Sequence, residues 1–225
     1  MTGQLSIRHV YKSYHQYGIE QIIFDDISLD FIAGQSYALM GASGSGKSTC
    51  IHLLAGIDSP TAGVIYMNGY DLASFCPEQA ALFFAHNISL VFQQPALFAE
   101  LTVLENVMLK AILAGCVTES SYKRAHSLLA EVGLAEKASV YPAMLSGGQQ
   151  QRVAIIRGIF MVPQFLLVDE PTGNLDEETG LQVIDLLLYY QEKYGMGLIV
   201  STHSQQIASR MQTVFHVEDK KISKI

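Results

Sequence analysis

The segment Gly41-Ala42-Ser43-Gly44-Ser45-Gly46-Lys47-Ser48-Thr49 decides the fold of this 225-residue chain. It fits the pattern G-x-x-x-x-G-K-[ST] and lies between a strand-like stretch, residues 36–40, and a helix-like stretch that runs to about Ala55. Small residues allow successive backbone N–H groups to converge on phosphate oxygens at the helix N-terminus. The Lys47 ammonium can neutralise β- and γ-phosphate charge, and the Ser48 hydroxyl can ligate magnesium. The segment therefore predicts a nucleotide site rather than an ordinary Gly/Ser turn.

Two acids that end an apolar stretch form a second candidate element. Phe165-Leu-Leu-Val precedes Asp169 and Glu170, and ligands of open parallel sheets bind beyond the carboxyl ends of the strands. Asp169 can hold a magnesium ion, and Glu170, on the other side of the strand, can polarise an attacking water. The alternative for the pair alone is a buried strand that ends in solvated acids. Together with the phosphate loop, the pair predicts an ATPase or GTPase.

The rest of the chain alternates between strand-like and helix-like patterns. Residues 5–31 show short apolar alternations that predict a β-rich start, and Asn68-Gly69 predicts a hairpin turn. The whole predicts an α/β fold: a mostly parallel sheet covered by helices, with an N-terminal antiparallel β layer. We expect a single domain, with a core of residues 1–93 and 143–225 and a helical insertion of residues 94–142. The further elements expected are strands at 88–92, 165–169 and 197–202 and helices at about 148–160 and 177–193.

Composition and charge exclude several classes of protein. The formal net charge is -7 with no basic block to offset it, so a nucleic-acid partner is not expected. The three cysteines have no paired spacing, which argues against a disulfide framework or a zinc site and favours a reducing compartment. No apolar core typical of a signal peptide stands at the start, and Arg157 and Pro163 interrupt the apolar run of residues 153–168. We expect membrane contact only through another polypeptide, without insertion of this chain.

The pentapeptide Leu145-Ser146-Gly147-Gly148-Gln149 narrows the class. A serine and two glycines at a helix N-terminus present a hydroxyl and bare N–H groups, which suit a γ-phosphate. An ordinary helix with a serine N-cap would look much the same, so the residues alone leave both interpretations open. Followed by Gln-Gln-Arg-Val-Ala, however, the pentapeptide resembles the signature motif of the ATP-binding cassette (ABC) family. The resemblance extends over nearly the whole chain, because the other motifs of the family follow in order.

The resemblance implies an ABC ATPase head, with a RecA-like P-loop core, and assigns further residues. Tyr14 matches the aromatic residue that stacks on adenine, and Gln93 matches the loop glutamine, which contributes to magnesium binding and catalysis. His203 matches the switch histidine that contacts the γ-phosphate, and Asn174 to Asp176 match the dimer-interface loop. The resulting expectation for ATP and Mg²⁺ is as follows: catalytic residues Glu170, His203 and Gln93; magnesium ligands Ser48, Gln93 and Asp169; ATP contacts Tyr14, Gly41, Ala42, Ser43, Gly44, Ser45, Gly46, Lys47, Ser48, Thr49, Ser146, Gly147, Gly148, Gln149 and Asp176.

The resemblance also implies an assembly. In the family, the signature segment of one subunit closes over ATP held by the phosphate loop of another, so hydrolysis requires a dimer. Because this chain carries both halves, a homodimer would have two complete sites. The helical insertion would receive a helix of an integral membrane transporter subunit, near residues 94–101. The expected location is therefore cytoplasmic, on the inner face of the cell membrane and attached through that subunit.

Residues 169–176, Asp-Glu-Pro-Thr-Gly-Asn-Leu-Asp, are similar to one branch of the family. That branch contains ATPase subunits for lipoprotein release, macrolide export and cell division, in which the subunit often transmits motion to its membrane partner. Departures from the branch include Cys50 after the phosphate loop, Val168 before the acids and Ser89 before Val-Phe-Gln. Two alternatives are a soluble ABC ATPase that acts on nucleic acid or ribosomes, and a P-loop kinase for a small molecule. The first would be expected to carry basic extensions, and the second would make the signature segment accidental.

Overall fold

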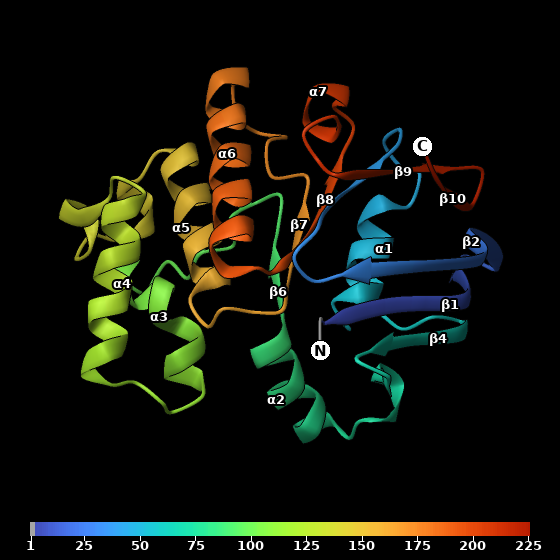
Figure 1. The fold of residues 1–225 in the computed structure, drawn as a ribbon, viewed down its shortest axis with the longest axis horizontal. Helices are drawn as coiled ribbons and strands as arrows, with labels where there is room; N and C mark the ends of the chain where they lie inside the picture. The colour runs from blue at the N-terminus through green and yellow to red at the C-terminus, as the bar shows by residue number, and fades with distance from the viewer. Residues whose placement is uncertain (1–2) are drawn as a thin grey trace.

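Two β-sheets frame the computed structural model, which describes residues 3–225 (Figure 1). The first sheet is antiparallel, in the order β2-β1-β4-β5. Its strands are β1 (Gln4–Gln16), β2 (Ile19–Ile32), β4 (Ala62–Met67) and β5 (Tyr70–Asp71). The second has the order β10-β9-β3-β8-β7-β6 and is parallel except for β10. Its strands are β3 (Ser36–Met40), β6 (Ile88–Val91), β7 (Phe165–Asp169), β8 (Gly197–Thr202), β9 (Thr213–Glu218) and β10 (Lys221–Lys224).

Helix α1 (Lys47–Leu54) lies between the two sheets. Cys50, Ile51, Leu53 and Leu54 are all buried, so the helix is apolar on more than one side, which is typical of a helix covered on both faces. They pack in one core cluster with side chains of β1, β2, β3 and β7. The phosphate loop at the start of α1 is therefore held by both sheets.

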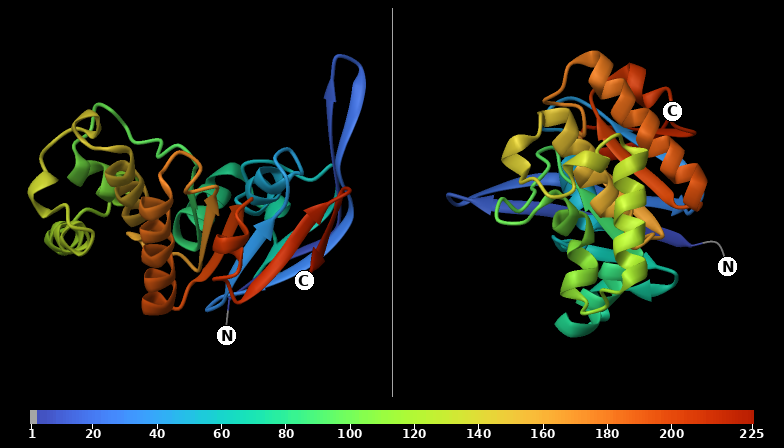
Figure 2. Two further views of the ribbon diagram at one scale, coloured as in Figure 1. Left: turned by 90° about the horizontal axis from the view of Figure 1, so that it is seen from above. Right: turned by 90° about the vertical axis from the view of Figure 1, so that its left-hand side faces the viewer.

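Most of the other helices cover the opposite face of the parallel sheet and extend away from it (Figures 1 and 2), whereas Phe83 and Phe84 pack against the core cluster that contains α1. Next to the sheet lie α5 (Gly147–Ile159) and α6 (Glu177–Tyr194), and beyond them lie α3 (Val103–Leu113) and α4 (Glu119–Glu131). The remaining helices are α2 (Pro77–Asn87), α7 (Gln205–Ala208) and the 3-10 turns Leu72–Ser74, Ala135–Lys137 and Pro142–Met144. None of the helices within residues 3–225 combines the length and the apolar character that a membrane crossing requires.

The expected α/β fold, with its antiparallel layer and mostly parallel sheet, is confirmed. Strands β3, β7 and β8 have the predicted bounds, and the Asn68-Gly69 turn has positive φ at both residues, 53° and 83°, as a type I′ hairpin turn requires. Two expectations were incomplete. The short N-terminal strands are in fact two long strands of 13 and 14 residues, and three elements for which no expectation was stated, α7, β9 and β10, lie after Thr202.

Candidate nucleotide-binding site

The phosphate loop connects β3 to α1 and borders an open cavity of ≈ 320 Å³. Gly44 and Gly46 have φ of 79° and 106°, in the left-handed region that side chains rarely adopt. A Cβ at Gly46 would also lie 2.8 Å from Cγ2 of Ile23, so the loop approaches β2 too closely for any other residue. The cavity is lined by Ile23, Ser43, Gly44, Gly46, Lys47, Ser48, Thr49, Gln93 and Glu170.

The Lys47 ammonium is the buried positive charge of this cavity. Its side chain is 3% exposed, and Nζ donates to the carbonyl oxygens of Gly41 at 3.0 Å and Ala42 at 2.9 Å. Nζ also lies 3.2 Å from Oε1 of Glu170. A buried cation of this kind needs negative partners, and a phosphate group can replace the carboxylate as one.

Asp169 forms a cluster of hard oxygen atoms with two serines. The Ser48 hydroxyl donates to Oδ1 of Asp169 at 3.0 Å, and the buried Ser201 hydroxyl donates to the same oxygen at 2.5 Å. Ser201 Oγ also accepts from the backbone N–H of Glu170 at 2.9 Å. Hydroxyl and carboxylate oxygens suit Mg²⁺, which is usually held by few protein ligands together with water and substrate phosphates. Accordingly, residues 3–225 include no cluster of three or more His, Cys, Asp and Glu side chains suited to a metal.

The side chain of Glu170 lies between two positively charged or chargeable groups. Oε1 is 3.2 Å from Lys47 Nζ, and Oε2 is 3.4 Å from His203 Nδ1. The backbone of Glu170 has φ of 40°, a left-handed conformation that costs about 1 kcal/mol or more for a residue with a side chain. The structure thus brings together Glu170 and His203, which are far apart in the sequence, at the edge of the phosphate cavity.

Gln93 and Tyr14 occupy different positions relative to the cavity. Gln93 follows β6, lines the cavity and is so close to Gly173 that a Cβ there would lie 2.6 Å from its Nε2. Tyr14 is not among the lining residues, and its hydroxyl donates to Oδ2 of Asp58 at 2.5 Å. Tyr14 as a whole residue is nevertheless 39% exposed, so part of its surface is open to a ligand.

The signature segment lies apart from this cavity. Ser146 is the N-cap of α5, and its hydroxyl accepts from Gln149 N at 3.4 Å while the Gln149 side chain accepts from Ser146 N at 3.1 Å. A Cβ at Gly148 would lie 2.7 Å from Cγ2 of Thr179, so α5 packs closely on α6 there. Asp176 caps α6, and hydrogen bonds from the backbone N–H and side chain of Thr179 lower its pKa. Within one chain, Ser146, Gly147, Gly148, Gln149 and Asp176 do not line the phosphate cavity.

Sequence reasoning missed three residues near the site: Ile23, Ser201 and Asp58. Ile23 belongs to an alternating strand with nothing to distinguish it from a core residue. Ser201 stands directly before Thr202-His203, so its position at the end of a buried strand was a usable signal. Asp58 contacts Tyr14 across 44 residues of sequence, and no local pattern reveals that contact.

Known proteins resemble the chain in sequence and in structure. The family described as ABC transporter matches residues 24–173. The lipoprotein-releasing system ATP-binding protein LolD of Syntrophus aciditrophicus is 38% identical over 97% of this chain and 98% of its own length. LolD of Nitratidesulfovibrio vulgaris is 43% identical over 93% of this chain and 90% of its own length. The ATP-binding cassette MJ0796, in a dimeric post-hydrolysis state bound to ADP and Pi, superimposes with a TM-score of 0.88 at 32% identity, over 98% of each chain.

Proposed function

This chain belongs to the ABC transporter family as an ATP-binding subunit with ATPase activity, and we propose that it closes as a homodimer around two ATP molecules to drive a membrane-embedded partner. The observation that carries the proposal is the cavity of the phosphate loop. It gathers a buried ammonium, a magnesium-type oxygen cluster and a carboxylate beside a histidine, while the signature segment of the same chain lies elsewhere.

The phosphate loop and Lys47 hold the triphosphate in this proposal. The backbone N–H groups of residues 41–49 and the α1 N-terminus face phosphate oxygens, and Lys47 exchanges its contact with Glu170 for β- and γ-phosphate oxygens. Ser48, Asp169 and Gln93 would hold Mg²⁺, which supplies charge neutralisation at the β- and γ-oxygens when bound.

Hydrolysis requires a water placed in line with the γ-phosphorus. Glu170, released from Lys47, accepts a hydrogen bond from this water and polarises it. A bond forms between the water oxygen and the γ-phosphorus, and the bond from the γ-phosphorus to the bridging oxygen breaks to give ADP and phosphate. His203, now 3.4 Å from Glu170, is placed to contact the γ-phosphate and to orient Glu170. Tyr14 stacks on the adenine ring.

The second half of each site comes from a second copy of the chain. Ser146 to Gln149 present an exposed helix N-terminus, and Asp176 lies on the neighbouring α6. In a dimer these groups can cover the γ-phosphate held by the partner, so that closure depends on ATP and reopening on hydrolysis. The dimeric structures of MJ0796 support this arrangement.

We further propose that the partner is an integral membrane protein and that the helical insertion, residues 94–142, contacts it. Phe98, half exposed, and Leu101, partly buried, offer apolar surface a few residues after Gln93, which lines the cavity. The similarity to LolD, the ATP-binding protein of lipoprotein-releasing systems, favours lipoprotein release, by mechanotransmission, as the work that is driven. The subunit would then be cytoplasmic and lie on the inner face of the membrane through its partner.

Co-expression with the membrane protein encoded next to this chain tests the proposal. We expect the chain to sediment with membranes only when that protein is present, and its ATPase activity to depend on the complex. A chain that stays in the soluble fraction, and whose ATPase activity does not respond to that protein, would contradict the membrane role.

A further inference from the structure

Tyr14 is held in place by a partly buried ion pair. Its hydroxyl donates to Oδ2 of Asp58 at 2.5 Å, and Lys12 Nζ donates to Oδ1 of the same carboxylate at 2.7 Å. The Lys12 ammonium lies 4.4 Å from the centroid of the Tyr14 ring, within the range of a cation–π interaction. One carboxylate therefore joins the phenol and the ammonium into a single unit, which we call the Tyr14 brace (Lys12, Tyr14 and Asp58).

The Tyr14 brace is more strongly constrained than a surface ion pair. The side chains of Lys12 and Asp58 are 7% and 27% exposed, and Lys12 Nζ also donates to the carbonyl oxygen of Ser59 at 2.9 Å. Burial acts to raise the pKa of Asp58, but the hydrogen bonds from Lys12 and Tyr14 more than offset it, so the pKa is lowered. In such a buried pair, removal of one member leaves the other charge uncompensated.

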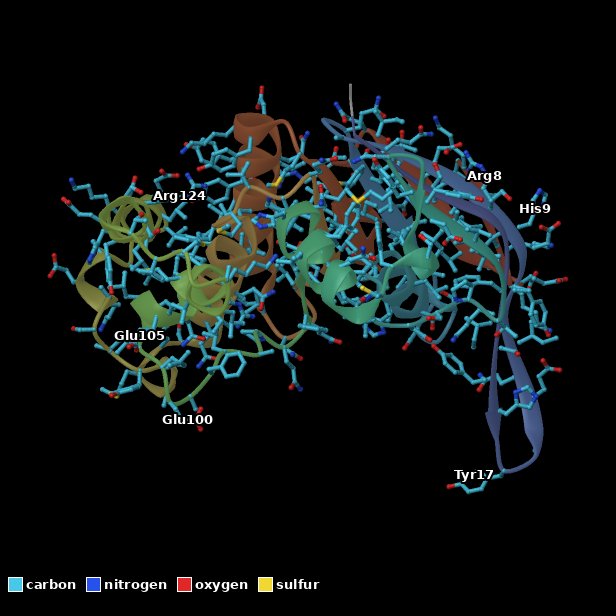
Figure 3. All side chains as sticks on the ribbon, turned by 90° about the horizontal axis from the view of Figure 1, so that it is seen from below. Arg8, His9, Tyr17, Glu100, Glu105 and Arg124 are labelled. Carbon is cyan, nitrogen blue, oxygen red and sulfur yellow. The ribbon has the colours of Figure 1, made fainter. Side chains whose placement is uncertain are left out.

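The brace connects Tyr14 to the helix that carries the phosphate loop. Asp58 lies just after α1, which begins at Lys47. Burial and the hydrogen bond to Asp58 raise the pKa of the Tyr14 phenol, against a smaller opposite effect of the Thr49 hydroxyl at the end of the loop motif. Ile23 lines the cavity, and it lies on β2 between the two residues that pair across the strands with Lys12 and Ser13 of β1. Tyr14 thus stands at the border of the cavity, before the hairpin extends away from the body to Tyr17 (Figure 3).

The brace also determines which face of the ring is open. Lys12 occupies one face of the ring, while the residue as a whole is 39% exposed. A base can therefore stack only on the face opposite the ammonium. Because the hydroxyl is anchored, the ring loses little rotational freedom when the base binds, and pre-organisation of this kind increases affinity.

We propose that Lys12 and Asp58 are positioning residues for the adenine ring: they fix Tyr14 with one face covered and the other presented to the base. They act on ATP through the base and not through the phosphates. This inference rests on the proposed function, specifically on the contact between Tyr14 and adenine.

The test compares ATP with inorganic tripolyphosphate, which has the phosphates and no base. Calorimetric titration of the full chain with each ligand and Mg²⁺ is done for wild type, Tyr14→Ala, Tyr14→Phe and Asp58→Ala. Since base–aromatic stacking contributes the equivalent of about 5- to 150-fold in affinity, we expect Tyr14→Ala to weaken ATP binding within that range. Tyr14→Phe and Asp58→Ala should weaken it by about 3- to 10-fold, a part of the stacking contribution, with tripolyphosphate affinity within about twofold of wild type.

Asp30→Ala is the matched control. Asp30 also accepts hydrogen bonds from a basic residue of β1, Arg8, but that pair lies nearer the base of the same hairpin (Figure 3). The Asp30→Ala change should leave the affinities for ATP and for tripolyphosphate unchanged. The double variant Tyr14→Phe/Asp58→Ala should be no weaker for ATP than Asp58→Ala alone, because both changes break the same contact. In steady state, the brace variants should raise KM for ATP with kcat little changed.

Three outcomes would overturn the proposal, and they are distinguishable. If Tyr14→Ala weakens ATP binding while Tyr14→Phe and Asp58→Ala do not, the positioning role of Lys12 and Asp58 is wrong and the contact between Tyr14 and adenine stands. If Tyr14→Ala leaves ATP affinity unchanged, the adenine contact of the proposed function fails, and the brace with it. If Asp58→Ala weakens the binding of ATP and of tripolyphosphate equally, Asp58 supports the fold of the phosphate loop and does not position the base.

Discussion

Replacement of Ser201 by alanine should destabilise the protein and slow hydrolysis, although Ser201 does not line the phosphate cavity. Its hydroxyl is fully buried and makes two contacts, as donor to the Asp169 carboxylate at 2.5 Å and as acceptor from the Glu170 N–H at 2.9 Å. The lost bond to a carboxylate costs about 1.5–3 kcal/mol, and an N–H left without an acceptor costs about 1–3 kcal/mol. Partial relaxation reduces the sum, so we expect a loss of about 2–4 kcal/mol in the free energy of unfolding.

For a chain of this size, such a loss corresponds to a fall in Tm of roughly 5–15 °C. The Glu170 peptide, with φ of 40°, would lose the hydrogen bond that holds it, so kcat should also fall, by about tenfold. Thermal unfolding and ATPase assays on Ser201→Ala measure both effects. The control is Ser209→Ala, which removes an exposed hydroxyl that donates to the Gln206 carbonyl, and it should change stability by less than about 0.5 kcal/mol. A Ser201→Ala protein with wild-type Tm and wild-type activity would refute the reasoning.

Three further predictions address separate parts of the molecule. Ser146→Arg should abolish ATP turnover with ATP affinity nearly unchanged, because the phosphate loop remains whole; loss of binding in a titration would show that the signature segment supports its own subunit instead. Burial, and to a smaller extent the charge of Arg157, lowers the pKa of Lys110 from 10.5 to about 8 in the folded protein. Between these two values the unfolded chain binds a proton at Lys110 that the folded protein has released, so the stability of the fold rises with pH. In urea titrations from about pH 7 to pH 10, wild type should therefore gain stability relative to Lys110→Met, by at most about 1.4 kcal/mol per pH unit, and a constant difference would contradict the shift. Since the chain has no Trp, the fluorescence of Tyr14→Trp should change with ATP and not with tripolyphosphate; equal responses to both ligands would argue against base stacking.

The sequence predicted those elements whose signals are local. Strands β3, β7 and β8 are short apolar runs that a glycine or a pair of acids bounds at one end, and each is buried along nearly its whole length. The long hairpin was read as several short strands because register shifts near Val10 and Lys12 interrupt the alternation of its side chains. Strand β10 is a charged edge strand that is defined by its pairing with β9, and its sequence alone gives little sign of it.

The distinction between local sequence signals and long-range contacts applies to the candidate site as well. The phosphate loop and the two acids that follow β7 could be predicted because their chemistry requires a fixed spacing in sequence. The contacts of Asp169 with Ser201 and of Tyr14 with Asp58 join residues 32 and 44 positions apart, and only the pairing of β7 with β8 and the packing of α1 on the antiparallel sheet bring them together. The roles of Ser146 to Gln149 remain a prediction, since in one chain they form an ordinary helix cap away from the cavity.

The central claim, that each site is completed by a second copy of the chain, is tested most directly by the oligomeric state of Glu170→Gln. Size-exclusion chromatography with light scattering should show a dimer of this variant with Mg·ATP and a monomer without it, because the bound ATP is no longer hydrolysed. Addition of Ser146→Arg to the same chain should abolish the dimer while ATP binding persists. A Glu170→Gln protein that stays monomeric with ATP and hydrolyses it normally would contradict the account, as would a double variant that dimerises equally well.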